Sequence, residues 1–496
     1  MFAAGRAGFV FRRALACIGF AAALGPLSGQ GAAELVGIWV GSLRVRSQTL
    51  TIVFHIEGRP GSFEATIDSP DQGAKDLPVS TVTLDGALLR LESSMLHATY
   101  QGTLSADGTS LSGTWTQGGA RLPLDMAKKD AAPVISRPQE PKPPYPYKTE
   151  DVVVENKRAG VRLAGTLVIP LPHANGSAVR ATGGEASGEG PFPAVVFATG
   201  SGPQNRDEEL LGHKPFLVIA DYLARRGIAS LRCDDRGTGQ SSGDFSKATT
   251  FDLADDVEAE FAYLASRPEA RKGSVGIVGH SEGGLIAPII ASRDAKVSFI
   301  VLLAGPGLSG ERILTLQGAA IARAAGKSDR EIEDAAAINT RLYAIAEGPG
   351  DAASLRAKLR GAYLDWLAGN TTMKSEERAA AEAGADRAVD QLASPWFRTF
   401  LSLDPAPYLA KVGIPVLALD GSKDLQVPSK ENLAGIRAAL GSRAGGMSPK
   451  SALLELPGLN HLFQHASTGS PDEYGKIEET FAPEALKAIG DWILGL

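Results

Sequence analysis

From about residue 148 onward, short apolar runs alternate with amphipathic stretches, and this alternation restricts more than any other feature what the chain can fold into. Apolar runs separated by helix-like stretches, such as residues 216–226 and 253–264, are typical of a mostly parallel sheet covered by helices on both faces. The first two runs lie close enough to pair as a hairpin. Eight strand candidates follow: 152–154, 163–169, 194–197, 228–231, 275–278, 299–303, 415–419 and 452–456.

One region interrupts the alternation. Between residues 303 and 415 the sequence contains helix formers throughout and no convincing strand. Residues 331–343 and 375–392 are the clearest helical stretches. We therefore expect a block of helices, at about residues 306–410, to be inserted after the sixth strand as a cap. Caps of this kind close over a pocket and select what enters it.

Residues 34–129 have a different character, because they contain short runs of β-branched residues bounded by glycine or aspartate. Asp85-Gly86 and Asp107-Gly108 are hairpin signals, since glycine accepts the positive φ that a tight turn needs. Several short strands at close spacing predict a small all-β domain, either an antiparallel barrel or a sandwich. A ligand-holding barrel and a structural or docking module remain alternatives, and the second is favoured because no polar constellation stands out.

The β domain is preceded by a segment that is typical of an export signal. Residues 1–33 combine a basic start at Arg6, Arg12 and Arg13 with an apolar run and then small residues, which places cleavage near Ala33. A membrane anchor needs about 20 apolar residues, and Pro26 comes too early for that. The sequence predicts a periplasmic or secreted protein with no stable membrane span after the signal is removed.

Residues 130–147 separate the β domain from the alternating region and are rich in proline. Such a segment is extended and semi-rigid, as a linker between domains would be. With 496 residues the chain is longer than a usual single core, so two folded units are expected. The second unit is therefore expected to span residues 148–496, after the linker.

The pentapeptide Gly279-His280-Ser281-Glu282-Gly283 lies between the apolar run at 275–278 and a second apolar run at 284–291. A G-x-S-x-G pattern between a strand and a helix is typical of a nucleophile elbow, in which glycines allow the sharp turn that exposes the serine oxygen. The pattern occurs twice, since Gly239-Gln240-Ser241-Ser242-Gly243 also matches it. Polar residues precede that copy and no apolar helix follows it, so we interpret it as a loop and predict Ser281 as the nucleophile.

A serine hydroxyl becomes a strong nucleophile only when a histidine accepts its proton and a carboxylate orients that histidine. In folds of this kind the three follow the order serine, acid, histidine. Of the seven histidines, only His461 and His465 come after the last strand candidate. His461 follows that strand directly, so its loop would carry the ring back to the sheet edge where Ser281 is expected. His465 is expected to be a neighbouring surface group.

The acid should follow the seventh strand candidate, where the sequence offers two aspartates. Asp420 ends the strand and could organise the turn that follows. Asp424 lies farther along the loop and has the reach to approach His461, so it is the favoured acid. Asp404, near the end of the cap, precedes Pro405 and is interpreted as a helix terminator.

The negatively charged oxygen that forms during attack needs two backbone N–H donors. One is predicted to be Glu282, the residue after the nucleophile, at the start of a helix. Ser201 is the second candidate, because Thr199-Gly200-Ser201-Gly202-Pro203 follows the third strand candidate and its glycines allow a close approach to a substrate. An ordinary glycine turn is the alternative interpretation.

Five segments stand out in combination: ATGSGPQNRDE at 198–208, DDRG at 234–237, GHSEGG at 279–284, LLAGPG at 302–307 and LNHLFQ at 459–464. With them, residues 148–496 resemble exported bacterial α/β-hydrolases, among them carboxylesterases and hydrolases grouped with serine aminopeptidases. The resemblance implies an α/β-hydrolase fold, with an eight-stranded mostly parallel sheet, and agrees with Ser281, Asp424 and His461 as the triad. It also implies that residues 234–236 are structural, as an ion-pair network near the pocket.

These features predict a serine hydrolase that cleaves small-molecule carboxylic esters through an acyl-serine intermediate, without a metal ion or cofactor. One alternative is a serine aminopeptidase, or another amide or thioester hydrolase, in which Asp207, Glu208 or Glu282 would hold a substrate amine. A second alternative is a non-catalytic envelope protein that binds a ligand. The formal net charge of −6, with no long run of lysine and arginine, gives no basic surface for nucleic acid.

Overall fold

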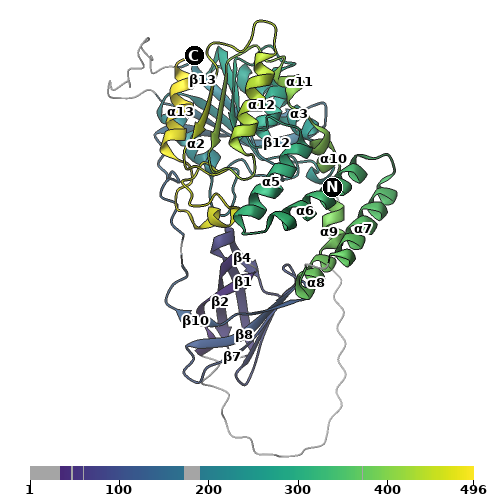
Figure 1. Ribbon diagram of the computed structural model, residues 1–496. Helices are drawn as coiled ribbons and strands as arrows, with labels where there is room; N and C mark the ends of the chain where they lie inside the picture. Colours follow the sequence, from purple (N-terminus) through teal and green to yellow (C-terminus); the bar gives the residue numbers. More distant parts are fainter. Residues whose placement is uncertain (1–33, 46–47, 60, 134, 172–189, 371–372) are drawn as a thin grey trace, which may run out of the picture.

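Figure 1 shows the computed structural model of the chain, which describes residues 34–45, 48–59, 61–133, 135–171, 190–370 and 373–496. The predicted export signal, residues 1–33, lies outside the described residues. An antiparallel β domain comes first and is followed by a larger domain in which helices cover a mixed sheet. The predicted order, an all-β domain before an α/β domain, is confirmed.

The β domain is one continuous antiparallel sheet of ten strands rather than two stacked sheets. Nine strands are hydrogen-bonded in the order β4-β3-β2-β1-β10-β8-β7-β6-β5, and β9 pairs with β8. Because β3 also touches β5, the sheet curls around a core that buries Trp39, Phe54 and Tyr100. The strands are β1 Gly37–Val45, β2 Gln48–Arg59, β3 Ser62–Ser69, β4 Ala74–Pro78, β5 Thr81–Asp85, β6 Leu88–Ser93, β7 Ala98–Leu104, β8 Ser110–Gln117, β9 Ala120–Pro123 and β10 Met126–Lys129.

Both predicted hairpin glycines lie in turns of this sheet. Gly86 connects β5 to β6 with a φ of 59°, and Gly108 lies between β7 and β8 with a φ of 68°. Positive φ is the backbone region that glycine enters without steric cost. A third turn follows β3, where the short helix η1 (Pro70–Gln72) leads to Gly73 at a φ of 64°.

The proline-rich linker lies against the α/β domain and is held there by side chains. Arg137 donates to the backbone oxygens of Leu211, Gly475 and Ile477 at 3.0, 2.8 and 2.7 Å. Gln139 accepts from the N–H groups of Thr480 and Phe481 at 2.6 and 3.0 Å. The linker therefore does more than space the domains, because it fixes where the β domain stands.

The β domain meets the α/β domain through η1. Backbones there approach so closely that a Cβ on Gly475 would lie 2.2 Å from the carbonyl oxygen of Asp71. A Cβ on Gly73 would likewise lie 2.4 Å from the nitrogen of Gly212. Gly475 belongs to a second short helix, η3 (Pro471–Lys476), which follows the last strand of the α/β domain. Two loops of the α/β domain are thus pressed against the tip of the β domain.

The sheet of the α/β domain has eight strands in the order β11-β12-β14-β13-β15-β16-β17-β18. The pairs β11–β12 and β12–β14 are antiparallel and the others are parallel. Each strand candidate of the sequence corresponds to one strand: β11 Tyr147–Asn156, β12 Val161–Pro170, β13 Phe192–Ala198, β14 Ala229–Cys233, β15 Ala270–His280, β16 Phe299–Leu303, β17 Val416–Gly421 and β18 Ala452–Leu456.

Helices cover the two faces of this sheet and form a separate core on each. One face carries α2 (Pro215–Arg225) and α13 (Pro483–Leu494), which bury residues such as Phe216 and Ile489. The other carries α3 (Thr250–Ser266), α4 (Gly283–Ala291) and α12 (Ser429–Gly441), which bury residues such as Phe261, Ile286 and Ile436. A short helix, η2 (Phe245–Lys247), precedes α3. The carboxyl ends of the parallel strands all point to one edge, where loops carry polar side chains.

In the described parts of the chain, seven helices between β16 and β17 form the block expected as a cap, drawn in green in Figure 1. The predicted helix at 375–392 is two helices, because Gly384 separates α8 from α9 and lies at the N-cap of α9. No helix in the described ranges is long and apolar enough to cross a membrane. The helices are α5 Gly310–Ala324, α6 Asp329–Glu347, α7 Ala352–Gly369, α8 Ser375–Ala383, α9 Ala385–Leu392, α10 Pro395–Ser402 and α11 Ala406–Leu409.

Candidate active site

Ser281 lies in the sharp turn that joins β15 to α4. Its φ is 52°, a left-handed conformation that a non-glycine residue adopts only under constraint. A Cβ on Gly279 would lie 2.0 Å from the oxygen of Gly283, and one on Gly283 would lie 2.0 Å from the oxygen of Ala198. The two glycines are therefore required by backbone contacts on either side of the serine, as a nucleophile elbow demands.

The second G-x-S-x-G copy is a loop that follows β14, as its polar surroundings predict. Ser241 donates its hydroxyl to the backbone oxygen of Asp234 at 2.7 Å. The same hydroxyl accepts from the N–H of Ala164 at 2.8 Å. Because both hydrogen-bonding functions of the hydroxyl are used by the backbone, Ser241 stabilises a turn and does not present a nucleophile.

The structure brings His461 and Asp424 together. Asp424 lies in the loop after β17 and His461 in the loop after β18, and both side chains are buried. The distance between His461 Nδ1 and Asp424 Oδ2 is 2.7 Å. The other oxygen of Asp424 accepts from the N–H groups of Gln426 and Val427 at 2.7 and 2.8 Å. His461 Nε2 has no hydrogen-bond partner within the described part of the chain, so it is available as a proton acceptor.

Asp420 is also buried, at the end of β17, but it does not contact His461. Its Oδ1 accepts from the N–H of Gly421 at 2.8 Å, and no donor faces its Oδ2. Burial, followed by the charge of Asp424 and a hydrogen bond with it, raises the pKa of Asp420 well above its usual value. The rise in pKa favours the protonated form of Asp420 beside the carboxylate of Asp424.

His465 is half exposed and pairs with two glutamates on the surface. Its Nδ1 lies 2.9 Å from Glu479, and its Nε2 lies 2.9 Å from Glu484. The interpretation of His465 as a surface group agrees with this position. Asp404 caps the start of α11, where its Oδ1 accepts from the N–H of Ala406 at 2.9 Å.

The glycine loop after β13 lies beside the nucleophile. A Cβ on Gly200 would lie 3.3 Å from the Cβ of Ser281. The N–H of Gly200 donates to Glu208 Oε1 at 2.6 Å and is therefore occupied. By contrast, the N–H groups of Ser201 and Glu282 donate to no acceptor among the described residues. These are the two N–H groups that the sequence predicts as oxyanion donors.

Asp235 holds the same loop from the other side. Its two oxygens accept from the Thr199 hydroxyl and the Gln204 N–H, each at 2.8 Å. Burial raises the pKa of Asp235 to about 8, and the charges of Glu208 and Glu282 add to the rise. Its neighbours form ion pairs, since Asp234 lies 2.8 Å from Arg206 and Arg236 lies 2.6 Å from Asp256. Of the three residues expected in an ion-pair network, Asp234 and Arg236 form ion pairs, whereas Asp235 accepts hydrogen bonds from Thr199 and Gln204.

The side chain of Glu282 connects the elbow to the cap. Trp396 of α10 donates its Nε1–H to both carboxylate oxygens at 2.9 Å, and the Thr250 hydroxyl donates at 2.7 Å. Burial raises the pKa of Glu282, although hydrogen bonds from Thr250, Trp396 and Ser201 oppose the rise. Sequence reasoning missed Trp396, because nothing in residues 394–402 indicates that the side chain reaches an elbow 114 residues away.

Sequence reasoning also missed the part played by Glu208, which it considered only as an amine binder. Glu208 has a φ of 52° and lies 3.0 Å from the ring of His280. Its place within the 198–208 segment was the only signal for it in the sequence. As for metals, no three His, Cys, Asp or Glu side chains in the described ranges gather in a geometry that could hold an ion.

The sheet order and the elbow define a serine hydrolase of the α/β-hydrolase fold. A sequence profile of one hydrolase family matches residues 159–440, more than half of the chain, and the description of that family is X-Pro dipeptidyl-peptidase (S15 family). The chain belongs to this family. The matched range includes Ser281 and Asp424, whereas His461 lies beyond its end.

One curated relative is the esterase EstD of Thermotoga maritima, which is 32% identical over 127 residues. The match spans 26% of this chain and only 30% of that esterase. Among solved structures, the esterase Pf2001 of Pyrococcus furiosus has a TM-score of 0.39 at 15% identity, covering 70% of this chain and 93% of its own. Est1E of Butyrivibrio proteoclasticus has a TM-score of 0.38 at 16% identity, covering 69% and 98%. At these scores the likeness to either structure is only general.

Proposed function

We propose that the protein hydrolyses small-molecule carboxylic esters through an acyl-serine formed on Ser281, with Asp424 and His461 as its partners. The observation that carries the proposal is the 2.7 Å contact of His461 Nδ1 with Asp424 Oδ2. A carboxylate at Nδ1 fixes the tautomer that leaves Nε2 free to accept a proton. The strained φ of Ser281 and the two unpaired N–H groups beside it support the same role.

In the first half-reaction, Ser281 Oγ attacks the carbonyl carbon of the ester while His461 Nε2 accepts the hydroxyl proton. The oxyanion that forms is stabilised by the N–H groups of Ser201 and Glu282. When the bond to the alcohol oxygen breaks, His461 returns the proton to that oxygen and the alcohol leaves. Asp424 remains ionised throughout and stabilises the imidazolium.

In the second half-reaction, water attacks the acyl-serine and His461 Nε2 accepts a proton from it. The same two N–H groups stabilise the second oxyanion. Breakage of the bond to Ser281 Oγ then releases the carboxylic acid and restores the serine hydroxyl. The cycle needs only protein groups and water.

A peptidase that recognises a substrate amine is the second candidate, because of the family to which the chain belongs. The acidic side chains that could bind an amine are, however, already engaged by other groups. This observation, with the similarity to an esterase, supports our choice of esters as the first candidate substrates. The engaged pairs are Asp207 with Arg232, Glu208 with Gly200 and His280, and Glu282 with Thr250 and Trp396.

The test compares short-chain p-nitrophenyl esters with aminoacyl and X-Pro p-nitroanilides on the same preparation of the protein. We expect esters to be cleaved with the higher kcat/KM. Asp424→Asn should lower kcat by about 10³- to 10⁴-fold, because the amide cannot fix the histidine tautomer. Asp420→Asn is the matched control and should change kcat little, since an amide resembles the protonated carboxyl.

Other outcomes would overturn the proposal in different directions. Faster cleavage of the anilides would favour the peptidase. An absence of reaction with a fluorophosphonate probe, on protein that is folded, would favour a non-catalytic binding protein. Equal ester rates for wild type and Asp424→Asn would exclude Asp424 as the acid.

We further propose that the protein is exported and that residues 1–33 direct this export. The basic start, the apolar run and the small residues before Glu34 support it. Mass spectrometry of protein purified from the cell envelope or medium should give an N-terminus near Glu34. Intact residues 1–33 on cytoplasmic protein would contradict export.

A further inference from the structure

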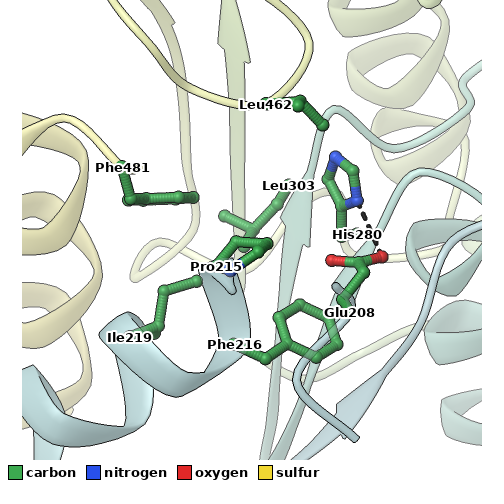
Figure 2. Close-up of a pocket in the computed structure, with 8 residues that line it drawn as sticks. All are labelled: Glu208, Pro215, Phe216, Ile219, His280, Leu303, Leu462 and Phe481. Carbon is green, nitrogen blue, oxygen red and sulfur yellow. Dashed lines mark hydrogen bonds and ion pairs between the residues drawn. The ribbon is translucent and has the colours of Figure 1, made fainter. Parts of the chain in front are cut away.

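A second histidine–carboxylate pair lies next to Ser281. His280 ends β15, next to Ser281, and Glu208 reaches it from the loop after β13, as Figure 2 shows. The ring and the carboxylate are both buried, and Nδ1 lies 3.0 Å from Glu208 Oε1. The reaction proposed above uses neither side chain.

This pair joins three loops of the site. Glu208 Oε1 accepts the N–H of Gly200, in the oxyanion loop, at 2.6 Å. On the other side of the ring, His280 Nε2 lies 3.0 Å from the backbone oxygen of His461. His280 itself continues into the elbow. Three segments that are far apart in the sequence are therefore connected through one imidazole and one carboxylate oxygen.

The two partners of the ring determine its protonation. A carboxylate oxygen and a carbonyl oxygen are both acceptors, so each needs an N–H opposite it. A neutral imidazole has one N–H and would place a nitrogen lone pair against one of the two oxygens. When Glu208 carries its negative charge, the imidazolium is the form of the ring that offers an N–H to both Glu208 and His461. The 3.0 Å distances on both sides fit this state.

The charges around the ring favour the same state. Burial by itself would lower the pKa of His280, but the charge and hydrogen bond of Glu208 outweigh it and raise the pKa above its usual value. The carbonyl of His461 and the charge of Asp424 act in the same direction. The ring of His461 is a further titratable neighbour, and its centroid lies 4.9 Å away.

A third buried histidine, His213, shows that burial alone does not favour the protonated form of an imidazole. His213 contacts the hydroxyl of Thr480 at 3.0 Å and the backbone oxygen of Tyr474 at 2.9 Å, and it has no carboxylate partner. Burial lowers its pKa to about 4, so it is neutral at neutral pH. His280 has the carboxylate of Glu208 beside it, whereas His213 lies near the charge of Arg137, which lowers its pKa further.

The unpaired side of Glu208 faces a small apolar cavity of about 10 Å³. In Figure 2, one carboxylate oxygen points to His280 and the other points away from it, among hydrophobic side chains. That second oxygen, Oε2, is buried and has no hydrogen-bond partner among the described residues. A carboxylate that is poorly solvated interacts more strongly with the cation beside it. The apolar lining consists of Pro215, Phe216, Ile219, Leu303, Leu462 and Phe481.

We propose that His280, protonated on both ring nitrogens and paired with Glu208, is a positioning residue that holds the oxyanion loop, the elbow and the His461 loop in one arrangement. The inference rests on the proposed function for its effect on rate, but the protonation of the ring does not depend on it. Loss of either charge would leave one of the two hydrogen bonds of the ring unmade and release the His461 loop or the Gly200 loop.

The first experiment counts the protons on the resting protein. With ¹⁵N-labelled histidine, His280 should show two N–H groups at pH 7, assigned by their disappearance in His280→Gln. His213 should show one N–H under the same conditions. A single protonated nitrogen on His280 at pH 7 would overturn the proposal, whatever the protein hydrolyses.

The second experiment removes the negative charge with Glu208→Gln. We expect kcat to fall by about 10- to 100-fold with little change in KM, because the reacting groups are misplaced while the pocket is retained. The alkaline limb of the pH–rate profile should also move to lower pH, since His280 now loses its second proton more easily. Glu209→Gln, an adjacent and exposed glutamate, is the matched control and should change neither.

A merely structural role for Glu208 would lower the amount of folded protein without moving the alkaline limb, and that result would contradict the inference. If Glu208→Gln does not fold, the proton count on the wild type decides alone. Failure of the proposed function looks different, because ester cleavage and probe labelling would then be absent although His280 carries two N–H groups.

Discussion

The chain contains two G-x-S-x-G segments. Their serines differ in the secondary structure around them and in the hydrogen bonds of their hydroxyl groups. At 279–283 the serine lies between a strand and a helix, and its hydroxyl makes no hydrogen bond within the described residues. At 239–243 the segment is a loop, and the Ser241 hydroxyl is bonded to the backbone at both Asp234 and Ala164. One serine is left free by its surroundings, whereas the other is part of the turn that it stabilises.

The backbone conformation explains why the two serines differ. Ser281 is held at a φ of 52° because Gly279 and Gly283 pack against backbone atoms that leave no room for a side chain. In the other copy, Gly239 and Gly243 themselves adopt the positive φ values, 53° and 104°, and relieve the serine of that strain. The pattern alone does not place a nucleophile. The positive φ falls on the serine in one segment, where it is strained, and on glycines in the other, where it carries no steric cost.

The largest expected difference between the segments is in activity. Ser281→Ala should lower ester hydrolysis by about 10⁴-fold or more, because no other group forms the acyl intermediate. Ser241→Ala should leave kcat nearly unchanged and lower the free energy of unfolding by about 1–3 kcal/mol, since two backbone groups lose their partner. Parallel assays and urea titrations test both. A comparable loss of activity in Ser241→Ala would break the comparison.

The second-largest difference is expected in stability, when a glycine of each segment is replaced by alanine. In Gly283→Ala the new Cβ would meet the oxygen of Ala198, so we expect a loss of about 3 kcal/mol or more, or no folded protein. In Gly243→Ala the nearest atom is the Arg236 Cβ at 3.2 Å, so only the positive φ is costly, at about 1–2 kcal/mol. Thermal unfolding of the two variants ranks them. A milder effect at Gly283 would mean that the elbow is less constrained than its contacts indicate.

Of the two segments, the elbow has a hydrogen bond to the cap among the described residues, and Trp396→Phe tests that bond. The variant keeps the aromatic ring but removes the N–H that both oxygens of Glu282 accept. We expect the free energy of unfolding to fall by about 1–3 kcal/mol, because a buried carboxylate loses a donor. The kcat should fall severalfold, since we propose that Glu282 also provides an oxyanion N–H. Trp492→Phe is a control, as that indole donates to Lys450 on the exposed surface. Equal effects would show that the cap bond does not support the elbow.

The smallest effect concerns Asp235, which precedes the second segment yet holds the oxyanion loop of the first. Its pKa of about 8, against an ordinary value of 3.8, means that the folded protein binds a proton that the unfolded chain releases between these values. This contribution to stability is therefore lost as the pH rises from about 4 to about 8.

Asp235→Asn resembles the protonated carboxyl and should show a smaller fall in unfolding midpoint between pH 5 and pH 8 than the wild type. Urea titrations at several pH values measure the difference. Identical slopes in the two proteins would show that Asp235 is ionised at neutral pH.

Local signals explain what the sequence could predict. The strand runs are apolar enough to be recognised singly, and β15 with α4 identifies Ser281 without reference to the rest of the chain. The two histidines after β18 could be separated by their distance from the strand, and His461 is the one that lies beside Asp424. Asp424 is favoured over Asp420 because it lies farther along the loop and can approach the histidine. The number of loop residues after a strand can be read from the sequence.

Contacts that depend on tertiary packing were not accessible in this way. Glu208 meets His280 and Trp396 meets Glu282 only because loops and a cap helix from distant parts of the chain converge on the elbow. The linker was predicted as a spacer, but Arg137 and Gln139 bond to backbone groups more than 300 residues later. A hydrogen bond from a side chain to the backbone cannot be recognised in the sequence, since any residue could supply the backbone group.

The contact of η1 with η3 has a consequence for the order in which the molecule is assembled. Residues 70–72 leave the ribosome long before residues 471–476, so the β domain is complete while the surface against which it packs does not yet exist. Because the β domain has its own core, which includes Trp39, Phe54 and Tyr100, it can be folded before the α/β domain is complete. Docking of the two domains then becomes a late step of maturation, and it coincides with the arrival of the loop that carries His461.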